Sequence, residues 1–386
     1  MSKTCIYLDN AATTRISDRV YNALLPYLRE SYGNPGAIYS LGREAARALK
    51  NSRLMCAKAL SCEQGEIYFT SGGSESDNWA IISAAESMRE QGKNRIVTSP
   101  FEHKAVLNTV KALEKRGFET VYLPVYENGV VKVEDAERVI DEKTALVTVM
   151  YVNNEIGTIQ PAAEIGAICK KKGVLFHTDA VQAAPHMIID AQNDNVDYLS
   201  ISGHKLHAPK GVGLLYCRKG VPLTPFVNGG AQEHGLRAGT ENLASIVGLA
   251  EAMAETAENA ESERKAMLPL TKKLTSALDK IKGAHFNGDR TKRIPSILNY
   301  SFEGVESESL VLQLDLKGIA CAGGSACTSG SVLPSHVLMS LGMSEALARG
   351  GLRISLGRYN TEDEINIFIG ELTNILEKLR KLTGSV

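Results

Sequence analysis

A lysine and an aspartate follow two apolar segments of this chain in a way that could place them side by side. Residues 196–201 (VDYLSI) lead directly into residues 202–205 (SGHK), which end on Lys205. Residues 174–179 (VLFHTD) form a similar run that ends on Asp179. Ligands of open α/β sheets bind at the carboxyl ends of the strands. We therefore expect an amine and a carboxylate at one edge of a sheet.

This pair of residues suits pyridoxal phosphate. That cofactor is held by a lysine as a Schiff base, and an acidic side chain keeps its pyridine nitrogen protonated. Ser202 and His204, which flank Lys205 in the sequence, are candidate donors to the phosphate. An exposed Lys205 and a helix-capping Asp179 are the ordinary alternatives for each residue alone, but the combination favours the cofactor.

A second segment could bind the phosphate. Residues 67–70 predict a strand, and residues 71–74 (SGGS) follow it before a helix that is expected to start near Glu75. Small residues at such a turn leave backbone N–H groups of the helix N-terminus open to an anion. Gly73 and Ser74 are therefore candidate phosphate ligands, although an ordinary turn with an N-cap has the same appearance. Nucleotide sites are disfavoured, because neither a Walker motif nor a G-x-G-x-x-G turn is present.

Three further polar residues are placed to serve the same cofactor. His103 lies at a predicted strand-to-helix junction, where an imidazole could stack on the pyridine ring and move protons, or simply cap the helix. Gln182 follows Asp179 by one helical turn and could donate to the phenolic oxygen of the ring. Asn154 follows the most hydrophobic predicted strand, residues 145–152, and is expected near a ligand.

Cys327 lies in a run of small residues, 322–331 (AGGSACTSGS), which predicts a mobile, exposed loop. An exposed thiol is open to oxidation and is a poor structural choice. It is a good choice if the thiol must meet a substrate at one end of its path and a partner at the other. Cys321 follows an apolar pair and is expected to be buried.

Composition and charge exclude several classes of protein. The chain has 386 residues, 44% of them hydrophobic, which suits a two-domain enzyme. A net charge of -1 gives no electrostatic reason to expect binding to nucleic acid or to an anionic membrane. No apolar run is long enough to span a bilayer or resembles a signal peptide. Seven cysteines without a C-x-x-C pair argue against a disulfide framework and a zinc ribbon, so we expect a cytosolic protein without a metal.

Predicted strands and helices alternate over the first two-thirds of the chain, which indicates a mostly parallel sheet covered by helices on both faces. A long, charged, alanine-rich helix is expected over residues 250–281, followed by a few strands and a closing helix near residues 362–382. We expect a large cofactor-binding α/β domain of residues 15–252. A smaller α+β domain, formed by residues 1–14 with 253–386, would carry the cysteine loop.

In their order along the chain, these motifs resemble those of cysteine desulfurases of the NifS/IscS type. Those proteins are fold-type I pyridoxal phosphate enzymes of aminotransferase class V, and the similarity runs nearly end to end. The matching segments are residues 7–14 (YLDNAATT), 71–78 (SGGSESDN), 102–104 (EHK), 153–157 (NNEIG), 177–182 (HTDAVQ), 202–205 (SGHK), 237–242 (RAGTEN), 324–329 (GSACTS) and 353–358 (RISLGR).

The resemblance implies a role for each residue at the cofactor. Lys205 would hold the cofactor and move the α-proton of the substrate. Asp179 would pair with the ring nitrogen, His103 would stack on the ring, and Gln182 would contact its phenolic oxygen. The residues that would hold the phosphate are Gly73, Ser74, Ser202 and His204. Thr240 would reach the phosphate of a neighbouring subunit, which implies a homodimer.

The resemblance also implies the substrate and the reaction. Arg353 would bind the carboxylate of L-cysteine with help from Asn154, a bidentate contact that suits a guanidinium. The thiolate of Cys327 would attack the substrate sulfur, which leaves a persulfide on Cys327 and releases L-alanine. The sulfur acceptor would be an iron–sulfur cluster scaffold, a tRNA-thiolation protein or a simple thiol.

Two segments depart from the pattern of that family. Residues 36–40 (GAIYS) stand where two small hydroxyl residues and then a histidine are usual, which could reshape the substrate entrance or the dimer contact. His234 stands where arginine is common.

Three other functions stay open on the sequence. Another fold-type I enzyme, a selenocysteine lyase or an aminotransferase, would share Lys205 and Asp179, but an aminotransferase has no use for Cys327. A redox-sensing or metal-binding protein built on Cys321 and Cys327 leaves Lys205 unexplained, and the spacing of these cysteines is unusual for zinc or a cluster. A catalytically inactive interaction protein would be expected to lack Lys205 or Cys327.

Overall fold

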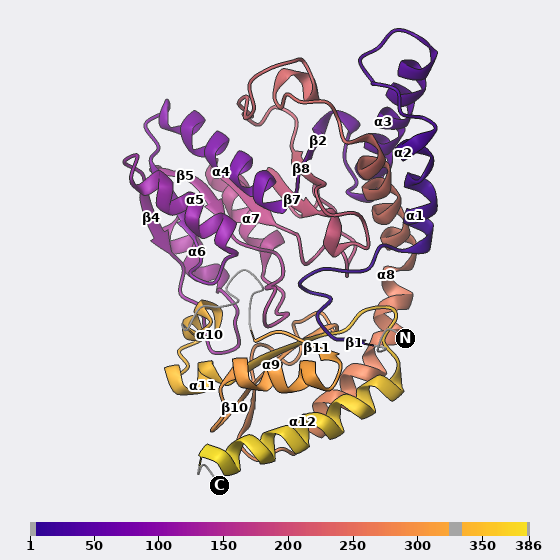
Figure 1. The fold of residues 1–386 in the computed structure, drawn as a ribbon. Coiled ribbons are helices and arrows are strands. Elements are labelled where there is room, and N and C mark those ends of the chain that lie inside the picture. Colours follow the sequence, from indigo (N-terminus) through magenta and orange to yellow (C-terminus); the bar gives the residue numbers. More distant parts are fainter. Residues whose placement is uncertain (1–4, 324–333, 384–386) are drawn as a thin grey trace.

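The computed structural model describes residues 5–323 and 334–383. Within these residues the largest sheet has seven strands in the order β2-β8-β7-β6-β5-β3-β4 (Figure 1). Its strands are β2 (Ile67–Thr70), β3 (Arg95–Thr98), β4 (Glu119–Tyr122), β5 (Thr144–Thr148), β6 (Leu175–Asp179), β7 (Tyr198–Ser202) and β8 (Gly213–Cys217). In this sheet β8 runs antiparallel to both of its neighbours, β2 and β7, whereas the other neighbouring strands described are parallel. The predicted mostly parallel sheet is confirmed.

Helices cover both faces of this sheet. Successive strand residues point to opposite faces, so Ile96 packs in one core with Trp79 of α4, whereas Val97 packs in another core with Ile165 of α7. The helices of the larger body are α1 (Asp18–Leu24), α2 (Pro26–Arg29), α3 (Ser40–Ala59), α4 (Gly73–Arg89), α5 (Lys104–Glu114), α6 (Val133–Val139), α7 (Ala162–Lys172) and the first part of α8 (Leu243–Leu278), with the 3-10 turns η1 (Gln64–Glu66), η2 (Gly203–Lys205) and η3 (Glu233–Gly235).

A smaller α+β body follows, as predicted. Its antiparallel sheet has the order β12-β10-β9, and β1 pairs in parallel with β11. Its elements are β1 (Ile6–Tyr7), β9 (Ala284–Phe286), β10 (Ile297–Phe302), α9 (Ser307–Leu316), β11 (Ile319–Ala320), α10 (His336–Ser340), α11 (Glu345–Arg349), β12 (Gly351–Ser355) and α12 (Glu362–Thr383). Its own core contains Leu8 from the N-terminal segment together with residues from Met267 to Leu376.

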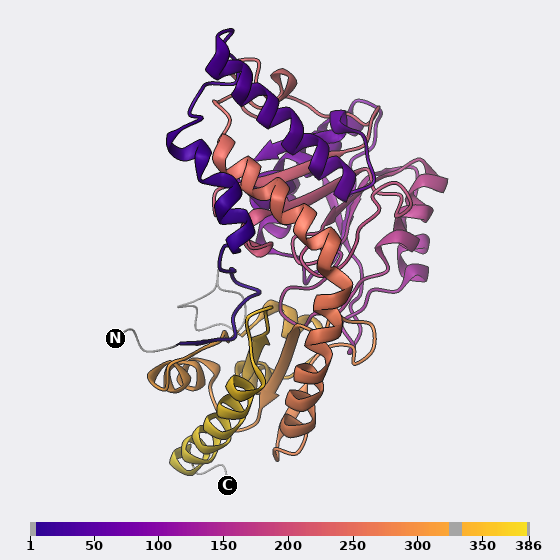
Figure 2. The same ribbon diagram turned by 90° about the vertical axis from the view of Figure 1, so that its right-hand side faces the viewer.

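Helix α8 joins the two bodies. Figure 2 shows it running from the larger body into the smaller one, where α12 lies beside it. The prediction that this helix starts at residue 250 is wrong, because Leu243, Ala244 and Ile246 are already buried and extend its packed face upstream. The helix passes without a break through residues 252 and 253, and the domain division placed there stays a prediction.

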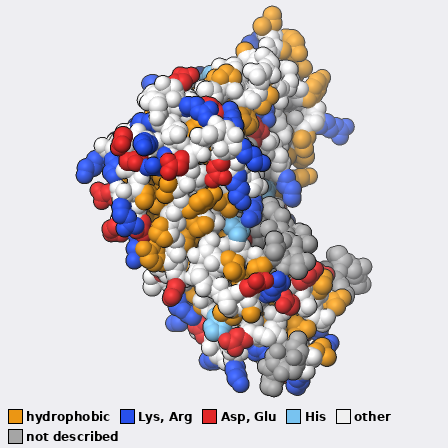
Figure 3. All heavy atoms as spheres, turned by 90° about the vertical axis from the view of Figure 1, so that its left-hand side faces the viewer, with side chains coloured by type: hydrophobic (Ala, Val, Ile, Leu, Met, Phe, Trp, Pro, Cys, Tyr) orange, Lys and Arg blue, Asp and Glu red, His pale blue; other side chains and the backbone are white. Residues whose placement is uncertain are grey.

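Charged side chains of both signs are interspersed over the face drawn in Figure 3, in keeping with the net charge of -1. In the described part of the chain, no helix combines the length and the apolar character that crossing a membrane requires.

The strand predicted over residues 145–152 ends early, at Thr148. Beyond it, the backbone N–H of Met150 donates to both carboxylate oxygens of Glu102, each at 3.0 Å. Ser99 donates its hydroxyl to the same carboxylate at 2.5 Å. Burial raises the pKa of Glu102 to about 8. This buried acid therefore fixes the loop after β5 against the start of α5.

Glu102 predicts a pH dependence of stability. Its pKa is higher in the folded than in the unfolded chain, so the folded state binds the extra proton and loses stability as the pH rises from about 5 to about 8. A glutamine keeps an acceptor for Met150 and a donor for Ser99 but has no proton to lose. We expect the melting temperature of Glu102→Gln, relative to wild type, to increase steadily over this range. Exposed Glu134→Gln is the control, and a constant difference for Glu102→Gln would contradict the assignment.

Candidate active site

A cavity of about 490 Å³ lies at the carboxyl edge of the large sheet. Its walls come from the ends of β6 and β7, the N-terminus of α4, residues 11–13 and strand β12 of the smaller body. Polar groups from many parts of the sequence therefore converge on one space at the edge where α/β sheets bind ligands.

Lys205 and Asp179 both line this cavity, as predicted. Strands β6 and β7 are parallel neighbours, with Asp179 opposite Ser200, so the two strand ends deliver the acid and the amine together. The ammonium of Lys205 donates to the carbonyl oxygens of Ala11 at 2.6 Å and Ala12 at 2.7 Å. These two carbonyls hold the amine over the cavity.

The carboxylate of Asp179 is buried and accepts a hydrogen bond from the backbone N–H of Val181 at 2.9 Å. Burial raises the pKa of Asp179, while the nearby His103 and Lys205 act to lower it. A cationic ring nitrogen placed against this carboxylate would favour its ionised form.

The turn before α4 faces the end of β7. Helix α4 starts at Gly73, so the N–H groups of Gly73 and Ser74 belong to its first turn, which has no intrahelical acceptors. A Cβ atom on Gly73 would lie 2.7 Å from Cγ2 of Val181 and 3.5 Å from Cβ of Ser202. The absence of a side chain thus leaves the helix N-terminus open beside Ser202, which suits an anion such as phosphate.

His204 also lines the cavity and is held by Thr13, with Nδ1 and Oγ1 3.2 Å apart. Burial, together with the charges of Lys205 and Lys210, lowers the pKa of His204 to about 4. The ring is therefore neutral at physiological pH. It can offer a neutral N–H to an anion, while Lys210 and the helix N-terminus supply positive potential.

His103 caps α5 and also lines the cavity. Its Nδ1 accepts from the backbone N–H of Ala105 at 3.2 Å. His103 therefore caps the helix and lines the cavity at the same time, and the two sequence-based alternatives do not exclude each other. Gln182 does not begin an α-helix but lies in a turn, and its side chain donates to the carbonyl oxygen of Ala11 at 2.8 Å. Both side chains are fixed by backbone contacts at the wall of the cavity.

Arg353 enters the cavity from β12 of the smaller body and is almost fully buried. Its guanidinium donates to the carboxylate of Asp9 at 2.7 Å and to the backbone carbonyl of Asn154 at 3.1 Å. Asn154 also lines the cavity. The structure thus brings the two predicted substrate-binding residues together.

One predicted residue is not part of this arrangement. Thr240 is exposed and does not line the cavity of its own chain. Cys327 lies outside the described residues. Cys321 is buried, as predicted.

Sequence reasoning missed Asp77, a buried acid on α4. One carboxylate oxygen of Asp77 lies within 4.8 Å of ligand atoms of both His103 and Asp179. Burial and the charge of Asp179 raise the pKa of Asp77, which favours the protonated form of this acid beside Asp179. The signal was its spacing, because Asp77 lies one helical turn after Gly73 and therefore on the same face of α4.

The neutral His177 lies behind this acid pair. Its Nε2 is 3.5 Å from the Asp77 carboxylate, and its Nδ1 is 2.8 Å from the hydroxyl of Thr148. Burial lowers the pKa of His177 to about 3. His177 therefore supplies a polar contact but no positive charge beside the Asp77 carboxylate.

These groups fit pyridoxal phosphate. They are an amine, a buried acid for a ring nitrogen, an imidazole, and the N–H groups of a helix N-terminus with the neutral His204 for the phosphate. The model of the class-V aminotransferase family matches residues 6–368. A cysteine desulfurase IscS of Methanosarcina thermophila is 46% identical over 378 residues, which are 98% of this chain and 93% of that protein.

Solved structures agree with this relationship. A NifS-like protein superposes with a TM-score of 0.91 at 41% identity, covering 97% of this chain and all of the other. SspA in complex with cysteine superposes with a TM-score of 0.81 at 36% identity, covering 92% of this chain and 100% of the other. Both the cofactor chemistry of the cavity and the similarity over nearly the whole length place the chain in one family. The chain belongs to the aminotransferase class-V family of pyridoxal phosphate enzymes and, within it, to the cysteine desulfurases.

Proposed function

We propose that this chain removes sulfur from L-cysteine, releases L-alanine and carries the sulfur as a persulfide on Cys327. The observation that carries this proposal is the convergence of Lys205, Asp179 and the open turn at Gly73 on one cavity that Arg353 also enters. The binding of cysteine by the similar protein SspA supports the choice of substrate.

Each residue that lines the cavity has a separate proposed role. Lys205 attaches the cofactor and moves the α-proton, and the carbonyls of Ala11 and Ala12 orient its amine. Asp179 would hold a protonated ring nitrogen, with His103 and Gln182 beside the ring. The residues that would hold the phosphate are Gly73, Ser74, Ser202 and His204. When bound, pyridoxal phosphate supplies an electron sink for the bond electrons released at the substrate.

Arg353 and Asn154 bind the substrate carboxylate and so set the direction in which the sulfur points. The thiolate of Cys327 then attacks that sulfur. A sulfur–sulfur bond forms, the carbon–sulfur bond breaks, and the carbon takes up a proton to become the methyl group of L-alanine. The persulfide passes to an iron–sulfur cluster scaffold, a tRNA-thiolation protein or a simple thiol.

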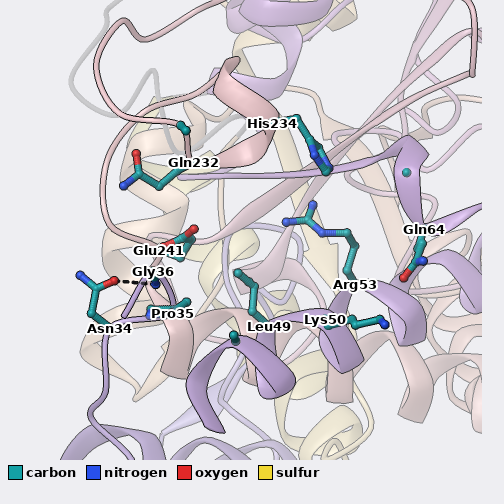
Figure 4. Close-up of a pocket in the computed structure, with 13 residues that line it drawn as sticks. Asn34, Pro35, Gly36, Leu49, Lys50, Arg53, Gln64, Gln232, His234 and Glu241 are labelled. Carbon is teal, nitrogen blue, oxygen red and sulfur yellow. Dashed lines mark hydrogen bonds between the residues drawn. The ribbon is translucent and has the colours of Figure 1, made fainter. Parts of the chain in front are cut away.

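We further propose that the active unit is a homodimer. Tyr32 and Ile38, between α2 and α3, are 71% and 89% exposed, which is unusual for side chains so apolar. A cavity of about 560 Å³ lies beside this segment, between Asn34 and the loop that carries His234 and Glu241 (Figure 4). Exposed Thr240 belongs to that loop, so a second subunit that covers this surface would receive Thr240 at its phosphate site.

The proposed location is the cytoplasm. All six cysteines in the described residues are free thiols, which suits a reducing compartment.

Removing the thiol and removing the amine should have different effects. Cys327→Ala leaves the described residues that line the cavity unchanged and should bind the cofactor and L-cysteine normally, yet form L-alanine on the order of 10³-fold more slowly or worse. Lys205→Ala should lose the absorption band of the lysine-bound cofactor. Wild-type chain with a thiol reductant should yield alanine and sulfide in equal amounts. Alanine formation by Cys327→Ala at the wild-type rate would contradict the proposed role of the Cys327 thiol.

A side chain at Gly73 should weaken cofactor binding. The Cβ of an alanine at position 73 would lie 2.7 Å from Cγ2 of Val181 and would narrow the space for the phosphate. We expect Gly73→Ala to raise the Kd of pyridoxal phosphate about tenfold or more, equivalent to ~1.4 kcal/mol, measured by fluorescence titration of the apoenzyme. Gly370→Ala, on α12, is the control, because no atom lies within 4 Å of a Cβ added there. Equal affinity of both variants would show that Gly73 does not form the phosphate site.

A charge on the exposed apolar segment should disrupt the dimer. We expect Ile38→Asp to shift the mass in sedimentation equilibrium toward the monomer and to weaken cofactor binding. Leu382→Asp, on α12 and also exposed (75%), should leave the mass unchanged. A wild-type chain that is monomeric at micromolar concentration would contradict the proposal.

A further inference from the structure

Arg353 forms an ion pair with Asp9, a residue that has no role in the mechanism proposed above. The Asp9 carboxylate accepts from a terminal nitrogen of Arg353 at 2.7 Å. The Arg353 side chain is 2% exposed, whereas that of Asp9 is 18% exposed. A buried guanidinium requires a counter-charge, because an unpaired buried cation costs several kcal/mol.

Asp9 is itself held rigidly by backbone bonds on both sides. The N–H of Leu8 donates to the carbonyl of Ala320 at 2.8 Å, and the N–H of Asn10 donates to the carbonyl of Ser355 at 3.2 Å. Ser355 and Arg353 both lie on strand β12. Carboxylate and guanidinium are therefore both anchored to strands of the smaller body, Asp9 between β11 and β12 and Arg353 on β12, which limits the ways in which they can move apart.

The pair leaves part of the guanidinium available. One terminal nitrogen is bound by Asp9 and the other by the carbonyl of Asn154 at 3.1 Å. Nε of Arg353 is buried without a hydrogen-bond partner among the described residues. An arginine has five N–H donors in a fixed plane, so contacts on two nitrogens fix the direction of the remaining donors.

We propose that Asp9 is a positioning residue that orients Arg353 for the α-carboxylate of the amino-acid substrate. This inference rests on the carboxylate-binding role given to Arg353 above. Asp9 acts only through Arg353: it balances the charge of the guanidinium and holds its plane, so that the substrate carboxylate meets preset donors.

The test uses the holoenzyme and L-alanine, the product, which binds without desulfuration. Binding is measured from the change that L-alanine causes in the absorption spectrum of the enzyme-bound cofactor. We expect Asp9→Ala to raise the Kd of L-alanine and the KM of L-cysteine about tenfold or more, with kcat changed by less than about threefold. Asp9→Asn, which keeps an acceptor oxygen but no charge, should lie between wild type and Asp9→Ala. Asp18→Ala is the control, because Asp18 is 85% exposed and pairs with Arg15 at the surface.

The double variant separates this inference from the proposed function. If Asp9 acts through Arg353, then Asp9→Ala adds no further loss to Arg353→Ala. Weak L-alanine binding by Arg353→Ala with wild-type or tighter binding by Asp9→Ala would overturn the role of Asp9 alone. Wild-type binding by Arg353→Ala would overturn the carboxylate role of Arg353. Loss of bound cofactor in Asp9→Asn as well as Asp9→Ala would also overturn the inference, because Asp9 would then be structural.

Discussion

The segment from Asp9 to Thr14 is the contact on which the active site depends. It leaves the small sheet after β1 and crosses to the large one, where the carbonyls of Ala11 and Ala12 accept from Lys205. The hydroxyl of Thr14 donates to the carbonyl of His204 at 2.8 Å. This segment therefore connects Lys205 and His204 of the larger body with Arg353, the proposed carboxylate ligand, of the smaller one.

Burial decides the charge of the groups around the cavity. His177 and His204 both have pKa values lowered well below neutrality, so neither adds a cation to the floor or the phosphate cradle. Burial raises the pKa of Asp77 and Asp179, which also repel each other's ionised forms. A site of this kind can hold a cationic ring and an anionic phosphate without competing internal charges.

The joint between the two bodies is also where the substrate would lie. Arg353 comes from β12, whereas Asn154 follows β5 of the large sheet, and their hydrogen bond at 3.1 Å closes the contact between the bodies. The buried Glu102 fixes the segment between β5 and Asn154, because its carboxylate accepts hydrogen bonds from the N–H of Met150. The contact between Arg353 and Asn154 thus depends on the packing of the two bodies against each other.

The sequence by itself determined the α/β class, the cofactor and most of the residues that line the cavity. It could do so because Lys205, Asp179 and Gly73 each lie where a strand ends, and parallel topology brings such ends to one edge. The start of α8 and the end of β5 were missed, since burial of Leu243 and the contact of Met150 with Glu102 involve distant parts of the chain. Only the tertiary structure decided that Asp77 lies beside Asp179 and that Asp9 pairs with Arg353, which is 344 residues away. Periodicity reports which face of an element a residue occupies, but the partner across a domain joint is fixed by packing.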